Sequence, residues 1–135
     1  MNLEERLRER IQREGPISFY EWMKAALYDE RGGYYCTDRV RQGRAGDYRT
    51  APETSPLFAA TFANYFAKLF YDLGSPERFS IVEVGAGSGE FALSVLTTLR
   101  SEHPNVFRAT NYVIEEMSGS SRQQCAARLS EFSVR

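Results

Sequence analysis

The alternation of hydrophobic and polar positions divides the chain into a helical N-terminal part and a later part with the pattern of an α/β fold. Leucine and isoleucine recur at helical spacing over residues 3–13, which predicts a short amphipathic helix that ends at Gly15. A second helix is predicted over residues 19–28, because Ser18 and Glu21 have the spacing of a capping box.

A third helix is predicted from Ser55, a residue suited to the N-cap and followed by proline, to Gly74. Its larger side chains form a broad and mostly aromatic stripe, which predicts that this face is buried in the core. The members of the stripe are Leu57, Phe58, Thr61, Phe62, Tyr65, Phe66, Leu69 and Phe70.

After Gly74 the pattern changes to strand, helix, strand, helix. Residues 79–84 are almost continuously apolar, as a buried parallel strand is. Residues 89–100 predict a crossover helix, residues 112–115 a second strand, and residues 118–129 a last helix. This order is typical of the α/β class. Natural sheets usually have more than two strands, so we expect the chain to be the first part of a longer protein.

The segment of residues 29–54 is too long for a plain connection and contains several glycines and tyrosines. Between Arg31 and Arg49, both included, it has five arginines against two aspartates. One interpretation is a solvated basic loop, as most charge runs are. The other is a docking surface for an anionic or acidic partner.

Composition narrows the function classes. The chain has 135 residues, 42% of them hydrophobic and 26% charged, and a formal net charge of -1. These values are those of an ordinary soluble domain, with no overall attraction to nucleic acid or to an anionic membrane. No apolar run approaches the roughly 18 residues of a membrane span, so no membrane insertion is predicted. Acids and arginines alternate at the N-terminus, which argues against a secretory signal or a transit peptide and predicts a cytoplasmic protein.

Metal binding is not predicted. The chain has one histidine, His103, and two distant cysteines, Cys36 and Cys125, without the spacing of metal ligands. These are too few ligands for a structural zinc site, and the cysteines are expected to be reduced and unpaired.

The stretch IVEVGAGSGEFA, residues 81–92, places a glycine turn between a strand and a helix. Such a turn brings backbone N–H groups to a helix N-terminus and lets a ligand approach the backbone closely. Two cofactor classes fit this arrangement, a nicotinamide or flavin dinucleotide and S-adenosylmethionine.

The spacing of the glycines distinguishes between the two cofactors. The dinucleotide motif G-x-G-x-x-G/A would place Glu90 at its last position, where a carboxylate suits neither tight packing nor a neighbouring pyrophosphate. The glycines fall instead at Gly85, Gly87 and Gly89, two residues after Glu83. This E-x-G-x-G-x-G form resembles motif I of class I S-adenosylmethionine-dependent methyltransferases.

The predicted second strand ends in Glu115 and Glu116. A carboxylate at the tip of the second strand of a βαβ unit can accept hydrogen bonds from both ribose hydroxyls of a cofactor. This applies to NAD and to S-adenosylmethionine equally. The alternative is that the two acids merely begin the next helix, where negative charge is favourable.

Four blocks of the sequence together resemble the MidA family: GPISFYEWMKAALYDERGGYY, GRAGDYRTAPETSPLF, IVEVGAGSGEFA and YVIEEMSGSSR. This family includes a mitochondrial arginine methyltransferase that assists assembly of a respiratory complex. The resemblance implies a class I methyltransferase fold. Residues 75–135 would form the first β-α-β unit of a partial Rossmann-like domain, preceded by an N-terminal helical extension over residues 1–74 that includes the loop 29–54.

The resemblance also implies site residues. The cofactor-binding residues would be Glu83, Gly85, Ala86, Gly87, Gly89, Glu116 and Thr50. Glu116, rather than Glu115, matches the acid of the family's Y-x-I-V-E-x-S block. Asp47, Thr50 and Glu53 match its G-D-F-x-T-S-P-E block, and Asp47 and Glu53 are the candidate catalytic residues.

The leading hypothesis is therefore methyl transfer from S-adenosyl-L-methionine to a protein side chain, with arginine the acceptor used by the mitochondrial member. Glu53 would orient the guanidinium, because a carboxylate matches it in bidentate geometry; the alternative is an acid that caps the following helix. The implied partner is a protein substrate, such as a respiratory-complex subunit, and the location would be mitochondrial in a eukaryote.

Two other function classes are alternatives. One is a non-catalytic assembly factor that binds the cofactor or a partner. The other is an NAD-dependent oxidoreductase, which the missing last glycine disfavours. Nucleic acid is an unexpected partner, because no RNA-binding module or strongly basic face is visible.

Overall fold

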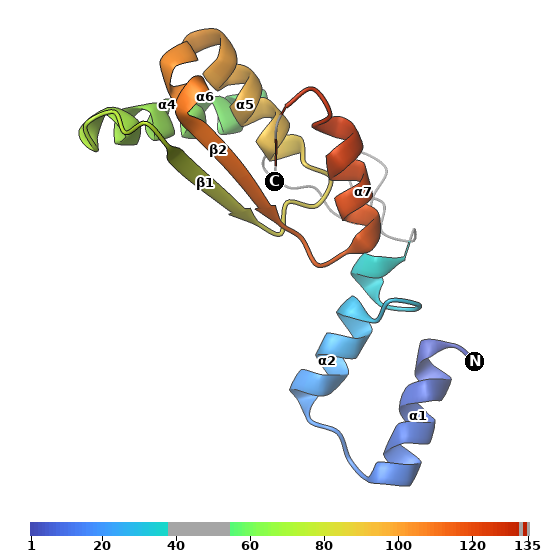
Figure 1. Cartoon of the computed structure of the whole chain (residues 1–135). Helices are drawn as coiled ribbons and strands as arrows, with labels where there is room; N and C mark the ends of the chain where they lie inside the picture. The colour runs from blue at the N-terminus through green and yellow to red at the C-terminus, as the bar shows by residue number, and fades with distance from the viewer. Residues whose placement is uncertain (38–54, 133, 135) are drawn as a thin grey trace.

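The computed structural model describes residues 1–37, 55–132 and 134. Figure 1 shows a helical N-terminal part, with α1 (Leu3–Glu14) and α2 (Phe19–Tyr28), beside an α/β unit. The short 3₁₀ helix η1 (Tyr34–Cys36) joins the two and contacts α7 (Gly119–Arg128) of the α/β unit.

Capping interactions determine where the first two helices begin. The predicted capping box of α2 is present, with Ser18 and Glu21 bonding each other's backbone N–H groups. A second box, between Asn2 and Glu5, begins α1. The two helices are tied by Arg6, whose guanidinium donates two hydrogen bonds, of 2.9 and 2.6 Å, to the carboxylate of Asp29.

The α/β unit contains the predicted βαβ arrangement. Strand β1 (Phe79–Val84) pairs in parallel with β2 (Thr110–Glu115), so that Val84 lies opposite Glu115. The crossover consists of α5 (Glu90–Glu102) and a separate short helix, α6 (Pro104–Ala109). The sequence predicted one crossover helix over residues 89–100 but not α6, which begins at Pro104 because a proline fits the first turn of a helix.

The buried face of α4 (Pro56–Asp72) differs from the predicted one. The residues of α4 that lie in the core are Ala59, Ala63, Ala67 and Phe70. Most of the aromatic stripe is not buried: Phe58 and Phe62 are each 37% exposed and Tyr65 is 54% exposed. The predicted aromatic core face is therefore wrong apart from its last residues, because the small alanines let α4 approach α5 closely while the rings flank the contact.

The two faces of the sheet differ in burial. Phe79, Ile81 and Tyr112 point into the core on one face. On the other face Val82 is 55% and Val84 76% exposed, so the prediction of a buried strand holds for only one face of β1. The buried face belongs to the same hydrophobic core as α4 and α5, and the glycine turn follows β1 at the tip of this sheet. No helix in the described residues is long and apolar enough to cross a membrane.

Candidate functional site

The glycine turn connects the tip of β1 to the start of α5. Gly85, Gly87 and Gly89 have φ of 74°, 56° and 79°, a region that other residues rarely adopt. The Gly85 N–H donates a 2.7 Å hydrogen bond to the carbonyl of Glu115, so strand pairing continues to the first residue of the turn. Gly89 is the N-cap of α5.

The two ends of the turn have different surroundings. A Cβ atom added at Gly85 would meet nothing within 4 Å. A Cβ added at Gly89 would lie 2.7 Å from the Sγ of Cys125 on α7. The first end of the turn is therefore open to a ligand, whereas the second is packed against the protein.

Glu116 lies directly against the glycine turn. One of its carboxylate oxygens accepts a 2.9 Å hydrogen bond from the Gly87 N–H, and the other accepts a 2.8 Å bond from the Ser118 N–H. Glu116 is half-buried, whereas its neighbour Glu115 is exposed. Of the two acids, Glu116 is thus the one placed at the turn, and its role in binding a cofactor stays a prediction.

Glu83 lies beneath the turn on β1. Its carboxylate accepts a 2.8 Å hydrogen bond from the hydroxyl of Tyr112, a side chain only 1% exposed. Burial raises the pKa of Glu83; the Tyr112 hydrogen bond lowers that pKa, and the charge of Glu116 raises it further. Burial also raises the pKa of Tyr112, and the nearby Glu83 adds to that effect, so the hydroxyl keeps its proton and remains a donor.

Helix α7 supports the turn from the packed side. Arg128 donates a 2.9 Å hydrogen bond to the hydroxyl of Ser88 and forms an ion pair with Glu90. Cys125 donates its S–H to the carbonyl of Gly87 across 3.6 Å. Sequence reasoning missed these contacts, because nothing in the spacing of α7 indicates which helix face meets the turn.

The chemistry of these groups can be compared with that of the two cofactor classes. Glu83 and Glu116 bring two carboxylates to one side of the turn, which suits hydroxyl or ammonium donors. Glu90 adds a further carboxylate at the start of α5, where a pyrophosphate would otherwise be favoured. The described groups therefore fit S-adenosylmethionine better than a dinucleotide.

Asp47, Thr50 and Glu53 lie outside the described residues, so their roles stay predictions. In the described residues, no cluster of metal-ligating side chains is found.

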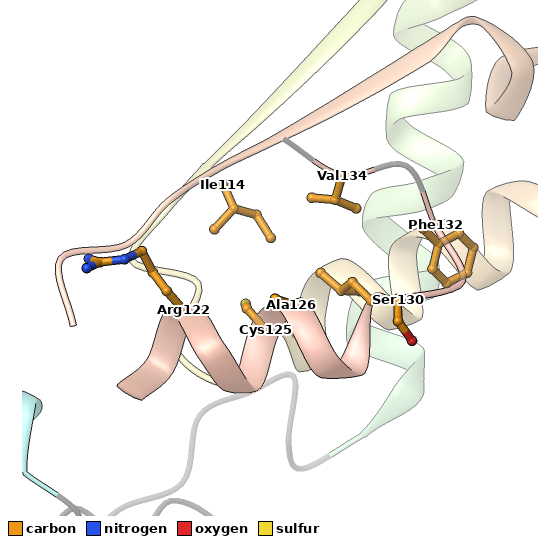
Figure 2. Close-up of a pocket in the computed structure, with 8 residues that line it drawn as sticks. Ile114, Arg122, Cys125, Ala126, Ser130, Phe132 and Val134 are labelled. Carbon is orange, nitrogen blue, oxygen red and sulfur yellow. The ribbon is translucent and has the colours of Figure 1, made fainter. Parts of the chain in front are cut away.

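A separate cavity of about 290 Å³ lies between β2, α7 and the last described residues. Figure 2 shows Ile114 and Val134 on one side of it and Cys125 and Ala126 on the side of α7. Arg122 lies at its border and donates to the carbonyls of Glu116 and Met117. The lining is mainly apolar, so the cavity resembles an unfilled part of the core more than a polar cofactor site.

A substitution at Glu83 tests the electrostatics of the site. Because the pKa of Glu83 is raised above its ordinary 4.5, the native state binds this proton more tightly than the unfolded chain does. Its contribution to stability is thus present below pH 4.5 and is lost as the pH rises through the folded pKa. We expect Glu83→Gln, which keeps an acceptor for Tyr112, to raise the melting temperature at pH 7 but not at pH 4. The exposed Glu115→Gln is the control, and equal melting temperatures of Glu83→Gln and the unaltered chain at pH 7 would contradict the expectation.

The chain is similar to known methyltransferases. A family model described as "Putative S-adenosyl-L-methionine-dependent methyltransferase" matches residues 61–134. A crystal structure of a likely methyltransferase from Burkholderia thailandensis, bound to S-adenosyl-homocysteine, is similar with a TM-score of 0.79 and 32% identity. That similarity covers 97% of this chain and 34% of the other.

Curated relatives are similar over a shorter range. The chain is 37% identical over 98 residues to "Protein arginine methyltransferase NDUFAF7 homolog, mitochondrial" of Drosophila melanogaster, and 33% identical over 87 residues to the human protein of that kind. These matches cover 73% and 64% of this chain but only 22% and 20% of the relatives. The chain thus spans about a fifth of the length of the curated proteins it matches.

Proposed function

Because this chain belongs to the family of S-adenosyl-L-methionine-dependent methyltransferases, we propose that it forms part of the cofactor site of an enzyme that methylates a protein side chain, with arginine as the acceptor. The observation that carries the proposal is the contact between the glycine turn and Glu116 at the tips of two parallel strands. The names of the arginine methyltransferase relatives support the acceptor.

The described residues would bind the cofactor at its ribose and along its methionine half. Glu116 would accept hydrogen bonds from the ribose hydroxyls, since a carboxylate has lone pairs beyond the two that Gly87 and Ser118 use. Gly85 and Ala86 would let the methionine half lie close to the backbone, with Glu83 as the nearby acid. When bound, S-adenosyl-L-methionine supplies a methyl group that its sulfonium already activates.

The remaining task of the protein is alignment, because holding the acceptor at about 3–3.5 Å from the methyl group in the right orientation provides much of the rate. Glu53 would orient the acceptor guanidinium, and Asp47 and Thr50 would border the same cleft. These three roles rest on the family resemblance alone.

The first test is calorimetric titration of S-adenosyl-homocysteine, with NADH as the control, into this chain and into the longest reading frame that contains it. Binding of S-adenosyl-homocysteine but not NADH to either protein supports the proposal. If neither protein bound either ligand, the proposal would be overturned in favour of a non-catalytic, partner-binding assembly factor.

The role of Glu53 can be tested separately. We expect Glu53→Gln to lower the rate of methyl transfer about tenfold or more, because an amide cannot form the bidentate, charge-assisted pair with a guanidinium. Binding of S-adenosyl-homocysteine should remain. Transfer of a radiolabelled methyl group to an arginine-containing protein substrate measures the rate, and an unchanged rate would leave Glu53 as a helix-capping acid.

The cellular role is a further part of the proposal. The curated relatives are named as mitochondrial proteins, which supports a mitochondrial location in a eukaryote, while a cytoplasmic one stays a prediction elsewhere. A respiratory-complex subunit as the protein substrate rests on the family resemblance.

The predicted division into residues 1–74 and 75–135 also stays a prediction, and α4 from the first part contacts α5 from the second.

A further inference from the structure

The carboxylate of Glu116 makes two hydrogen bonds to backbone N–H groups that a residue serving only a ribose would not need. The Gly87 donor belongs to the middle of the glycine turn, and the Ser118 donor to the N-cap of α7. The two oxygens of one side chain therefore join the turn after β1 to the segment after β2.

The other contacts of the turn lie around Gly87 rather than at its N–H: the Gly89 N–H donates a 2.9 Å bond to the carbonyl of Ala86, and Arg128 bonds the hydroxyl of Ser88. The first residue of the turn is fixed by the bond from Gly85 to the carbonyl of Glu115, and the last by the packing of Gly89 against Cys125. Between these points the Gly87 N–H is bonded only to Glu116 in the described residues, while the Gly87 carbonyl receives the weak 3.6 Å bond from Cys125. Gly87 also has a positive φ of 56°, which glycine adopts as one of several accessible conformations.

We propose that Glu116 is a positioning residue for the glycine turn as well as an acceptor for the ribose: its bond to Gly87 holds the turn in the conformation that receives the methionine half of the cofactor. The ligand part of this inference rests on the proposed function. A carboxylate has about four acceptor positions, and the two backbone bonds leave the others for hydroxyl groups. Ribose binding and turn geometry are thereby coupled through one side chain.

Glu116→Gln is the informative variant, because the amide keeps the shape of the side chain. It has only one acceptor oxygen, whereas two backbone N–H groups need an acceptor. Glu115→Gln is the matched control, since Glu115 is the adjacent acid and is exposed. The first readout is amide hydrogen exchange of Gly87 in the protein without ligand. We expect Glu116→Gln to speed this exchange about tenfold, with exchange across β1 unchanged as the reference for an intact fold.

The second readout compares two ligands. S-adenosyl-homocysteine carries both the ribose and the amino acid half, whereas adenosine carries the ribose alone. A positioning role predicts that Glu116→Gln weakens binding of S-adenosyl-homocysteine about tenfold more than binding of adenosine. A residue that only accepts ribose hydroxyls would weaken both by the same factor.

The outcomes separate this inference from the proposed function. Because the remaining oxygen of Glu116→Gln can still accept from Gly87, Glu116→Ala is measured as well, and unchanged Gly87 exchange in both variants would overturn the positioning role whatever the ligands do. Faster exchange with equal losses for the two ligands would overturn its link to the methionine half. If the unaltered protein bound neither ligand, the proposed function would fail and the ligand part of the inference with it, while exchange at Gly87 would still decide whether Glu116 holds the turn.

Discussion

Replacing Gly89 with alanine is expected to destabilise the chain by about 2–4 kcal/mol, the sum of a left-handed backbone strain and an overpacked contact. The φ of 79° at Gly89 is unfavourable for any residue with a Cβ atom. The new methyl group would also lie 2.7 Å from Cys125 Sγ, and the Cα of Cys125 at 3.4 Å limits how far α7 can yield. The free energy of unfolding from urea denaturation measures the effect.

Gly85→Ala is the matched control for this prediction. Gly85 has nearly the same φ, 74°, but its Cβ would meet no atom within 4 Å. Gly85→Ala should therefore lower the free energy of unfolding only by the backbone strain, about 1–2 kcal/mol. In the background of Cys125→Ala, which removes the clashing sulfur, Gly89→Ala should cost no more than Gly85→Ala. Equal losses for Gly85→Ala and Gly89→Ala in the unaltered background would contradict the steric argument.

Replacing Gly33 with alanine is expected to unfold the junction between α2 and η1, at a local cost of about 2–4 kcal/mol. A Cβ at Gly33 would overlap the backbone nitrogen of Asp29 and would lie 2.7 Å from the Asp29 carbonyl oxygen and 2.8 Å from the nitrogen of Tyr28. All three are backbone atoms at the end of α2, so no side chain can move aside to relieve the overlap.

The consequence of Gly33→Ala should be local. η1 contacts α7, the helix that follows Glu116 in the chain, so η1 lies close to the candidate site. Hydrogen exchange should become faster throughout α2 and η1 while β1 and β2 keep their protection. Gly32→Ala is the comparison variant. The atom nearest to its Cβ is the side-chain Cβ of Leu3, at 2.8 Å, in the separate helix α1, so its closest contact does not involve the backbone of α2. Unchanged protection of α2 in Gly33→Ala would refute the prediction.

Local sequence signals predicted most of the fold. The strand β1 and the helix α2 have the predicted bounds, and the parallel βαβ order follows from apolar runs separated by a glycine turn. What failed was the buried face of α4. Its aromatic and alanine stripes have the same helical period, so periodicity alone could not decide which one faces α5. Close helix packing favoured the small residues.

The candidate site was predictable only in the parts that depend on local sequence. The glycine spacing and the acid after β2 could be read from the sequence, because each depends on neighbours in the chain. The bond of Glu83 to Tyr112, the bond of Glu116 to Gly87 and the contact of Arg128 with Ser88 join residues from separate elements. Such contacts depend on the register of β1 against β2 and on the rotation of α7, which no local pattern specifies.

The parallel pairing of β1 with β2 also bears on the order of events during translation. β1 leaves the ribosome before the whole α5–α6 crossover has been made, so it cannot find its partner strand at once. The helices α4 and α5, which contact each other directly, are both complete before β2 emerges. We therefore expect α4 and α5 of the nascent chain to pack together first. The apolar β1 segment would then lie against these helices, or be bound by a chaperone, until synthesis reaches Glu115.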